Sequence, residues 1–153
     1  MIDITSINAV SGILAAVGVI VGVVFTVLQL RDLVKTRQTD LVTRLYSTFG
    51  SKEFSEVFIK VLNLEYKDYK DDPTKYPIQV TAFFEGIGIL LKRKLIDIDI
   101  VDDLFSSPIK LSWETLTPIV EDYRKRFNRP QVCEWFEYLY NEMQKREQTL
   151  QST

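Results

Sequence analysis

Few side chains in this sequence could carry chemistry, and the one used most often in catalysis is missing. The 153 residues contain no histidine and a single cysteine, Cys133. Without histidine there is no Ser-His or Cys-His couple and none of the usual ligands of catalytic zinc and haem. A single cysteine excludes an intramolecular disulfide, a CxxC redox pair and a thiolate metal cage. We expect Cys133 to be a small buried hydrophobic side chain; a redox-sensing or intermolecularly paired thiol is the alternative.

The densest acidic group consists of Asp97, Asp99, Asp102 and Asp103. A calcium-binding EF-hand loop needs spaced oxygen ligands, a central glycine and a terminal glutamate, and this segment does not supply them. Acidic side chains also gather in the first turn of a helix, where they complement the helix dipole. We therefore interpret this group as the start of a helix.

Glu85 is the only charged residue between Ile78 and Leu91. A carboxylate in such apolar surroundings needs a cation or hydrogen-bond donors as partners. A later helix offers Arg124 or Arg126, and we predict a buried ion pair of Glu85 with Arg124 that fixes the helix register. A functional buried acid is the alternative.

No recognised motif adds a site to these candidates. The sequence has no phosphate-binding GxxxxGK[ST], no GxGxxG after a strand and no HExxH. Nineteen Lys and Arg against 21 Asp and Glu give a net charge of -2, which argues against a nucleic-acid partner. We predict no catalytic residue, no metal and no cofactor.

The N-terminal region is the most informative element. No charged residue lies between Asp3 and Arg31, and residues 9–28 are almost wholly apolar. Twenty helical residues span about 30 Å, the thickness of the hydrocarbon core. The sequence predicts a transmembrane helix over residues 7–30, after a short extracytoplasmic segment, residues 1–6. A cleaved signal peptide is the alternative, but the N-terminus is not basic and the apolar stretch is long.

The orientation follows from the residues beside this helix. Arg31, Lys35 and Arg37 follow it, whereas no basic side chain precedes it. The positive-inside rule then predicts a single-pass protein of the cell membrane, with its N-terminus outside and its C-terminal domain in the cytoplasm.

One face of the predicted transmembrane helix collects its small and polar residues, called here the small-residue face. The members of this face are Asn8, Ser11, Ala15, Gly18, Gly22, Thr26 and Gln29. Small side chains let two helices approach closely, and polar ones bond across the interface. We predict a helix-packing face; a lone anchor with incidental glycines and a pore-lining face are the alternatives.

Helical periodicity continues to the C-terminus, so the predicted fold is all-α: one transmembrane helix plus a compact cytoplasmic bundle of about five helices. Residues 31–50 are predicted as a juxtamembrane helix and residues 51–145 as the cytoplasmic domain. We expect a polar loop over 66–77, a central helix over 78–94 and a short helix capped by Asp97 or Asp99. Pro118 should kink or break the next helix. The tail from Gln144 to Thr153, of which residues 146–153 form the polar tail outside the domain, should fray.

The aromatic residues of the last two predicted helices are expected to form core, and a ligand pocket is the alternative. They are Trp113, Tyr123, Phe127, Trp135, Phe136, Tyr138 and Tyr140. Tyr138 and Tyr140 cannot both face inward with Trp135, so we predict that they leave aromatic surface for a partner.

Several segments resemble a known family. They are FFEGIGILLKRKLIDIDIVDDLF (Phe83 to Phe105), Trp113-Glu114, Arg124 and FEYLYNEM (Phe136 to Met143). The sequence is similar to small prokaryotic proteins classed only as a domain of unknown function, over residues from about 10 to 143. The resemblance implies one N-terminal membrane helix joined to a helical domain, and it implies no activity.

The sequence therefore predicts a non-enzymatic accessory or regulatory subunit. Its expected partners are membrane lipid and a larger membrane protein complex, onto which its transmembrane helix and cytoplasmic domain would dock. A self-assembling single-span homo-oligomer, acting as scaffold or pore, is one alternative. A membrane-tethered ligand sensor or enzyme of unknown reaction is the other.

Overall fold

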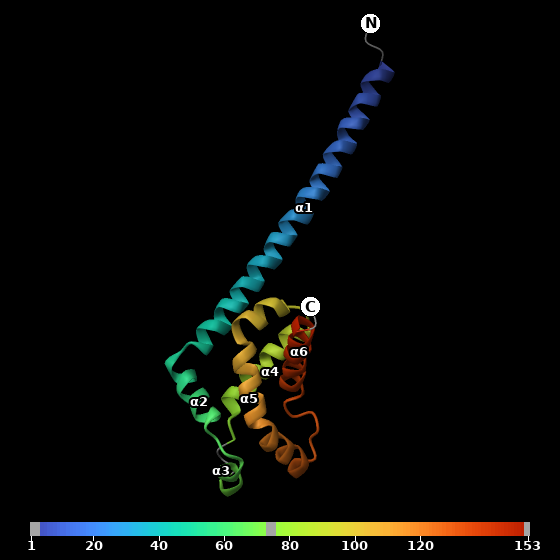
Figure 1. Cartoon of the computed structure of the whole chain (residues 1–153). Coiled ribbons are helices and arrows are strands. Elements are labelled where there is room, and N and C mark those ends of the chain that lie inside the picture. The colour runs from blue at the N-terminus through green and yellow to red at the C-terminus, as the bar shows by residue number, and fades with distance from the viewer. Residues whose placement is uncertain (1–3, 73–75, 152–153) are drawn as a thin grey trace. The chain divides into compact units, whose positions relative to one another are not determined.

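The computed structural model describes the backbone of residues 4–72 and 76–151, and the side chains of residues 12, 14–72 and 76–149 (Figure 1). These ranges contain helices and no strand, which confirms the all-α prediction. The chain divides into two compact units, Met1–Asp40 and Leu41–Thr153. The helices in order are α1 (Ile4–Phe49), α2 (Lys52–Leu62), α3 (Tyr66–Asp71), α4 (Ile78–Lys92), α5 (Ile98–Phe127) and α6 (Glu134–Gln151).

Helix α1 is uninterrupted from Ile4 to Phe49, so the predicted transmembrane and juxtamembrane helices are one element (Figure 1). Among the described residues, Leu14–Phe49 is the helix long and apolar enough to cross a membrane. None of its apolar window is buried in the structure. In the described part of the first unit, the apolar side chains of α1 from Leu14 onward are therefore exposed and pack into no protein core.

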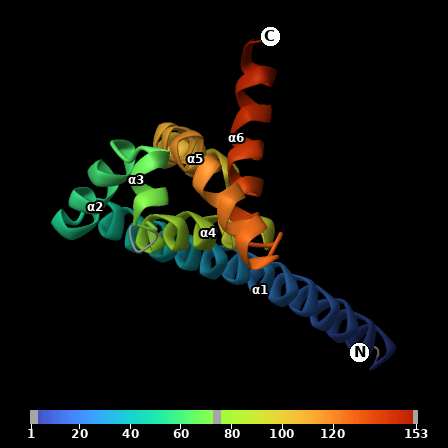
Figure 2. The same ribbon diagram turned by 90° about the horizontal axis from the view of Figure 1, so that it is seen from below.

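The second unit is a helical bundle organised around α4. Figures 1 and 2 show α4 between α2 and α6, and it contacts both. Val80, Phe84 and Ile87 of α4 are fully buried. The ring of Phe84 lies 4.9 Å from that of Phe136 in α6, which in turn lies 4.9 Å from Trp113 in α5. This confirms the prediction that α4 is the central helix.

The last turn of α1 belongs to this bundle through a cluster of phenylalanines. The ring of Phe49 lies between 5.4 and 6.0 Å from the rings of Phe54, Phe58, Phe83 and Phe105. These residues come from α2, α4 and α5. Aromatic pairs at this spacing add to the stabilisation that burial gives. The bundle therefore begins before the end of α1.

Three predicted element boundaries were wrong, and in each case packing explains the difference. The expected loop at 66–77 contains helix α3, which is held by Tyr69, a fully buried side chain. Helix α6 does not fray after Gln144 but continues to Gln151. Arg146 and Glu147 in this last part form ion pairs with residues of α5.

The third difference concerns α5, which runs unbroken through Pro108 and Pro118. We expected a separate short helix capped by Asp97 or Asp99, and a kink or break of the next helix at Pro118. Figure 1 shows instead one helix that bends along its length. Each proline removes one backbone hydrogen bond. Buried residues on both sides of the prolines, among them Phe105 and Ile119, pack into the core and favour continuing the helix.

Helix α4 touches the start of α6 so closely that a side chain at Gly88 has no room. A Cβ atom there would lie 2.1 Å from the carbonyl oxygen of Trp135 and 2.7 Å from its carbonyl carbon. Both obstructing atoms are backbone, so they cannot rotate away. At Gly86, two residues earlier, a Cβ atom would meet no such neighbour within 4 Å. The two glycines therefore form a matched pair for an experiment.

We expect Gly88→Ala to destabilise the bundle by about 2–3 kcal/mol, because α4 and α6 must move apart. Gly86→Ala should stabilise it by about 0.5–1 kcal/mol, because alanine is the better helix former. Thermal melting of the detergent-solubilised full chain, followed by circular dichroism, measures both. Equal melting temperatures for the two variants would show that the close approach at Gly88 does not exist.

Candidate functional site

The first candidate surface is the small-residue face of α1. Gly18 and Gly22 have open space where a Cβ would stand, and the Thr26 hydroxyl donates to the Gly22 carbonyl oxygen at 2.8 Å. Ala15 and Gln29 are exposed as well. The side chains of Asn8 and Ser11 lie outside the described residues. The described part of this face is thus uncovered, and two glycines would allow a second helix to approach closely.

The predicted cytoplasmic flank lies directly after this face on the same helix. Arg31, Lys35 and Arg37 are all exposed. Arg31 and Lys35 border a shallow apolar surface formed by Val27, Leu30 and Val34. Long cationic side chains at the end of an apolar helix can extend towards a charged interface while their stems cover apolar surface. This arrangement fits the boundary between hydrocarbon and water.

The second candidate is Glu85, and here the structure corrects the sequence. The backbone N–H of Phe136 donates to Oε2 of Glu85 at 2.7 Å. Phe136 belongs to the first turn of α6, whose N–H groups have no partner within their own helix. A carboxylate is the favoured group at such a positive helix end. Glu85 therefore acts as a cap for α6 that is supplied by another helix.

Arg124 forms its ion pair elsewhere. Its Nη2 lies 2.7 Å from Oε2 of Glu137, and its Nε donates to the carbonyl oxygen of Val132 at 2.9 Å. The predicted ion pair of Glu85 with Arg124 was thus wrong in its partners. Backbone amides at the start of α6 supply the hydrogen bonds that Glu85 needs, and they cannot be recognised from residue types. Arg124 instead connects α5 to the segment leading into α6.

The surroundings of Glu85 favour its neutral form. Burial raises the pKa of Glu85 above its usual value of 4.5, and the nearby Glu134 carboxylate adds to this. The amides of Phe136 and Trp135, and the Arg124 charge, lower the pKa in part. Since the folded pKa is the higher one, the contribution of Glu85 to stability is fully present below pH 4.5. It is lost as the pH rises through the folded pKa.

Glu85→Gln should therefore remove this loss of stability at higher pH. The glutamine side chain still accepts a hydrogen bond from the backbone amide, and it carries no charge. The melting temperature of the variant should fall less than that of the native chain as the pH rises above 4.5. Glu85→Ala removes the acceptor and should cost about 1–2 kcal/mol. Melting curves across this pH range measure both effects. A Glu85→Gln chain that is less stable than Glu85→Ala at neutral pH would contradict the capping role.

Cys133 lies just before α6 and is buried at 7% exposure, which agrees with the structural expectation for this residue. Its Sγ lies 3.3 Å from the hydroxyl of Tyr76, and the Tyr76 ring lies 4.9 Å from that of Tyr123 in a tilted arrangement. Burial raises the pKa of the Cys133 thiol, whereas the Tyr76 hydroxyl lowers it in part. A buried thiol with a raised pKa has little reactive thiolate.

We expect a thiol-specific reagent to modify Cys133 at least about tenfold more slowly in the folded chain than in the denatured chain. Absorbance-detected labelling at mildly alkaline pH measures the two rates. Tyr76→Phe is the matched variant, because it keeps the ring and removes the hydroxyl that contacts the sulfur. Equal rates in folded and unfolded native chain would show an accessible, reactive thiol.

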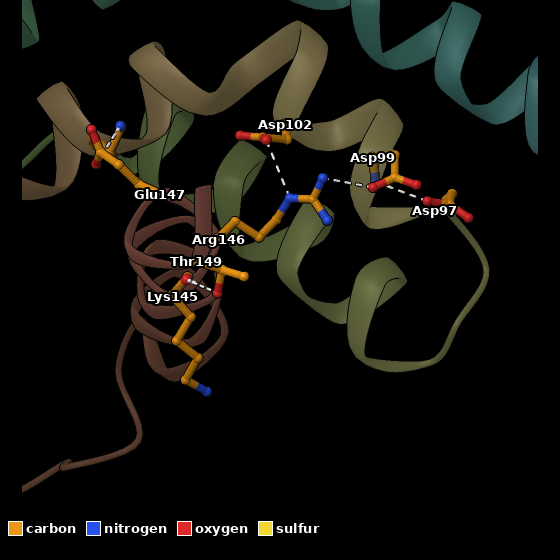
Figure 3. Close-up of polar contacts among 8 residues, drawn as sticks. Asp97, Asp99, Asp102, Lys145, Arg146, Glu147 and Thr149 are labelled. Atoms are coloured by element: carbon orange, nitrogen blue, oxygen red, sulfur yellow. Dashed lines mark hydrogen bonds and ion pairs between the residues drawn. The ribbon is translucent and has the colours of Figure 1, made fainter. Parts of the chain in front are cut away.

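The acidic residues at the start of α5 are accounted for by neighbouring groups. Oδ1 of Asp97 accepts the N–H of Asp99 at 2.8 Å and caps the helix. Figure 3 shows Arg146 of α6 placed between two other carboxylates, Asp99 at 2.6 Å and Asp102 at 3.2 Å. Among the described residues no group of acidic, cysteine or histidine side chains could hold a metal ion. This cluster joins α5 to α6, and nothing in its sequence spacing pointed to Arg146.

The predicted partner-facing tyrosines are both half-buried. The Lys92 ammonium lies over the Tyr138 ring, 4.9 Å from the ring centroid. The Tyr140 hydroxyl accepts from Nε2 of Gln144 at 2.9 Å and lies 3.4 Å from a carboxylate oxygen of Glu114. Both residues are partly exposed, and contact with a partner protein stays a prediction.

The described bundle has hollows but no paired catalytic groups in them. One cavity of about 300 Å³ lies between α2 and α4, lined mainly by Val57, Val61, Leu64 and Tyr76. Another, of about 450 Å³, adjoins Phe54 and Phe83. Both are chiefly apolar, so the chemistry that they offer is shape and hydrophobic contact.

These features define a class: an all-α protein with one N-terminal helix long and apolar enough to span a membrane, followed by a helical bundle. The chain matches, over residues 13–143, the model of a family described as a domain of unknown function, DUF4760. It belongs to that family, as its resemblance to proteins classed as a domain of unknown function indicated. No curated protein and no solved structure matches the chain.

Proposed function

We propose that this chain is a non-enzymatic accessory or regulatory subunit of a larger membrane protein complex. Helix α1 anchors it in the cell membrane, with the N-terminus outside and the bundle in the cytoplasm. The small-residue face packs against a helix of the complex. The bundle then presents its surface to the cytoplasmic part of the same assembly.

The observation that carries this proposal is the composition of α1 around its circumference. Gly18 and Gly22 leave open space on one face. Val17, Ile20 and Val24 on the opposite face are exposed, with no core to cover them. Hydrocarbon suits the second face, whereas the first offers backbone surface and polar groups to another helix. The basic flank at Arg31, Lys35 and Arg37 supports the stated orientation.

The same face supports self-assembly as a second candidate. A homo-oligomer would pair the small-residue faces of identical helices and place several bundles side by side, as a scaffold or around a pore. A tethered ligand sensor is supported by the two apolar cavities described above, one beside Tyr76 and one beside Phe54 and Phe83. Because the described side chains place no nucleophile beside a base in the cavity beside Tyr76, an enzyme has the least support.

The test begins with membranes from the source cells, in which the native chain carries a C-terminal tag. Alkaline carbonate should leave the chain in the membrane, and its intact mass should include residues 1–40. A cleaved signal sequence would instead release a shorter chain. Purification in mild detergent, with mass measurement of the complex, then shows what accompanies it.

We expect Gly18→Leu/Gly22→Leu to lose the accompanying proteins, because leucine side chains prevent close helix approach. Val17→Leu/Val24→Leu is the matched control, with the same number of added leucines on the opposite face. A homo-oligomer sensitive to the glycine changes would favour self-assembly. A monomer with no accompanying protein would contradict both assembly proposals.

A further inference from the structure

The end of helix α4 carries three consecutive exposed cations, Lys92, Arg93 and Lys94. The helix closes with two backbone bonds, from the N–H of Lys94 to the Leu91 carbonyl oxygen and from that of Leu95 to Leu90, both 2.9 Å. Lys94 has φ 57°, in the left-handed region. This closure usually places glycine at that position, because a side chain there is sterically disfavoured. Local folding preferences therefore do not explain a lysine at this turn.

Apolar and aromatic groups adjoin these cations. Leu95, the third residue after the end of α4, is 50% exposed. The Lys92 ammonium lies 4.9 Å from the centroid of the Tyr138 ring, which is only half-buried. We call this set, Lys92–Leu95 with Tyr138, the α4-end patch. Cations, an exposed leucine and a tyrosine together are typical of surfaces that lie at the boundary between lipid and water.

Neighbouring acids do not neutralise the patch. None of its three cations forms an ion pair with an acidic side chain among the described side chains, residues 12, 14–72 and 76–149. Glu142, next to Tyr138, is paired with Lys145 at 2.7 Å. Asp97 is the other nearby acid. The three cations of the patch and Lys145 against Glu142 and Asp97 give a local charge of about +2, on a chain of net charge -2. The basic end of α5 differs, because Arg124 and Arg126 there lie within 4.0 Å of Glu137 and Asp122.

We propose that the α4-end patch binds the headgroups of anionic phospholipids on the cytoplasmic face of the membrane. This inference rests on the proposed anchoring and orientation of α1. Anchoring keeps the bundle close to the bilayer, so even a small patch is at high effective concentration. Basic residues are attracted to the negative inner leaflet. The remaining, net acidic surface is repelled, and the bundle is thereby oriented with this patch towards the lipid.

The test uses the full chain in lipid nanodiscs and hydrogen–deuterium exchange of the segment 90–97. Discs contain either phosphatidylcholine alone or phosphatidylcholine mixed with phosphatidylglycerol. We expect about tenfold slower exchange in the anionic discs. High salt should abolish this protection, because it screens exposed charges. Phosphatidylcholine discs supplemented with inorganic phosphate separate a membrane surface from a site for a free anion.

Three variants make the test specific. Lys92→Gln/Arg93→Gln/Lys94→Gln should lose the protection in anionic discs. Lys52→Gln/Lys60→Gln/Lys125→Gln removes the same amount of charge from other exposed positions and should keep the protection in anionic discs. Lys94→Gly should raise the melting temperature, since it relieves the left-handed turn, while it reduces the protection about threefold. Opposite changes in stability and protection exclude loss of folding as the cause.

Equal exchange in the two lipid compositions would overturn the inference, as would loss of protection in the control triple variant. Protection by inorganic phosphate in phosphatidylcholine discs would also overturn it in favour of a simple anion site. Failure of the anchoring proposal is seen separately, as a chain that does not remain with discs of either composition.

Discussion

The bundle depends on the place where α4 meets the beginning of α6. At Gly88 the two backbones approach so closely that no side chain fits between them. About one turn earlier in α4, the carboxylate of Glu85 accepts a hydrogen bond from a backbone N–H in the first turn of α6. The glycine permits the contact, and the carboxylate removes the cost of leaving helix-end amides unpaired in it. Phe84 and Phe136, stacked 4.9 Å apart, surround this junction with apolar contact.

Other parts of the bundle follow from this junction. With α6 held at its start, Arg146 and Glu147 in its second half reach α5 and form ion pairs there. These pairs are partly exposed and contribute little individually. Together, however, they favour the helical conformation of the polar and highly charged end of α6. Packing also keeps α5 helical across its two prolines, because buried residues recur along the whole length of the helix.

The first unit obeys a different constraint, because it has no protein core. In water, a helix exposing so many Val, Ile and Leu side chains would be unstable as a monomer. In lipid the same surface is favourable, and backbone groups are satisfied within the helix. The small-residue face is the part of α1 where short side chains would allow another helix to approach. Gly88 thus permits close backbone approach inside the bundle, and we propose the same use for Gly18 and Gly22 on the open helix.

The sequence by itself determined the elements whose signal is local and strong. A charge-free run of helix length, helical spacing of apolar residues, Asp97 at a helix start and a central α4 can all be recognised from residue types. The tertiary structure decided which side chains meet. Glu85 binds backbone amides rather than Arg124, Arg124 binds Glu137, and Tyr69 turns an expected loop into a helix. Such contacts join residues far apart in the chain through backbone groups that every residue possesses. No pattern of residue types can therefore specify them, and they exist only once the helices have packed.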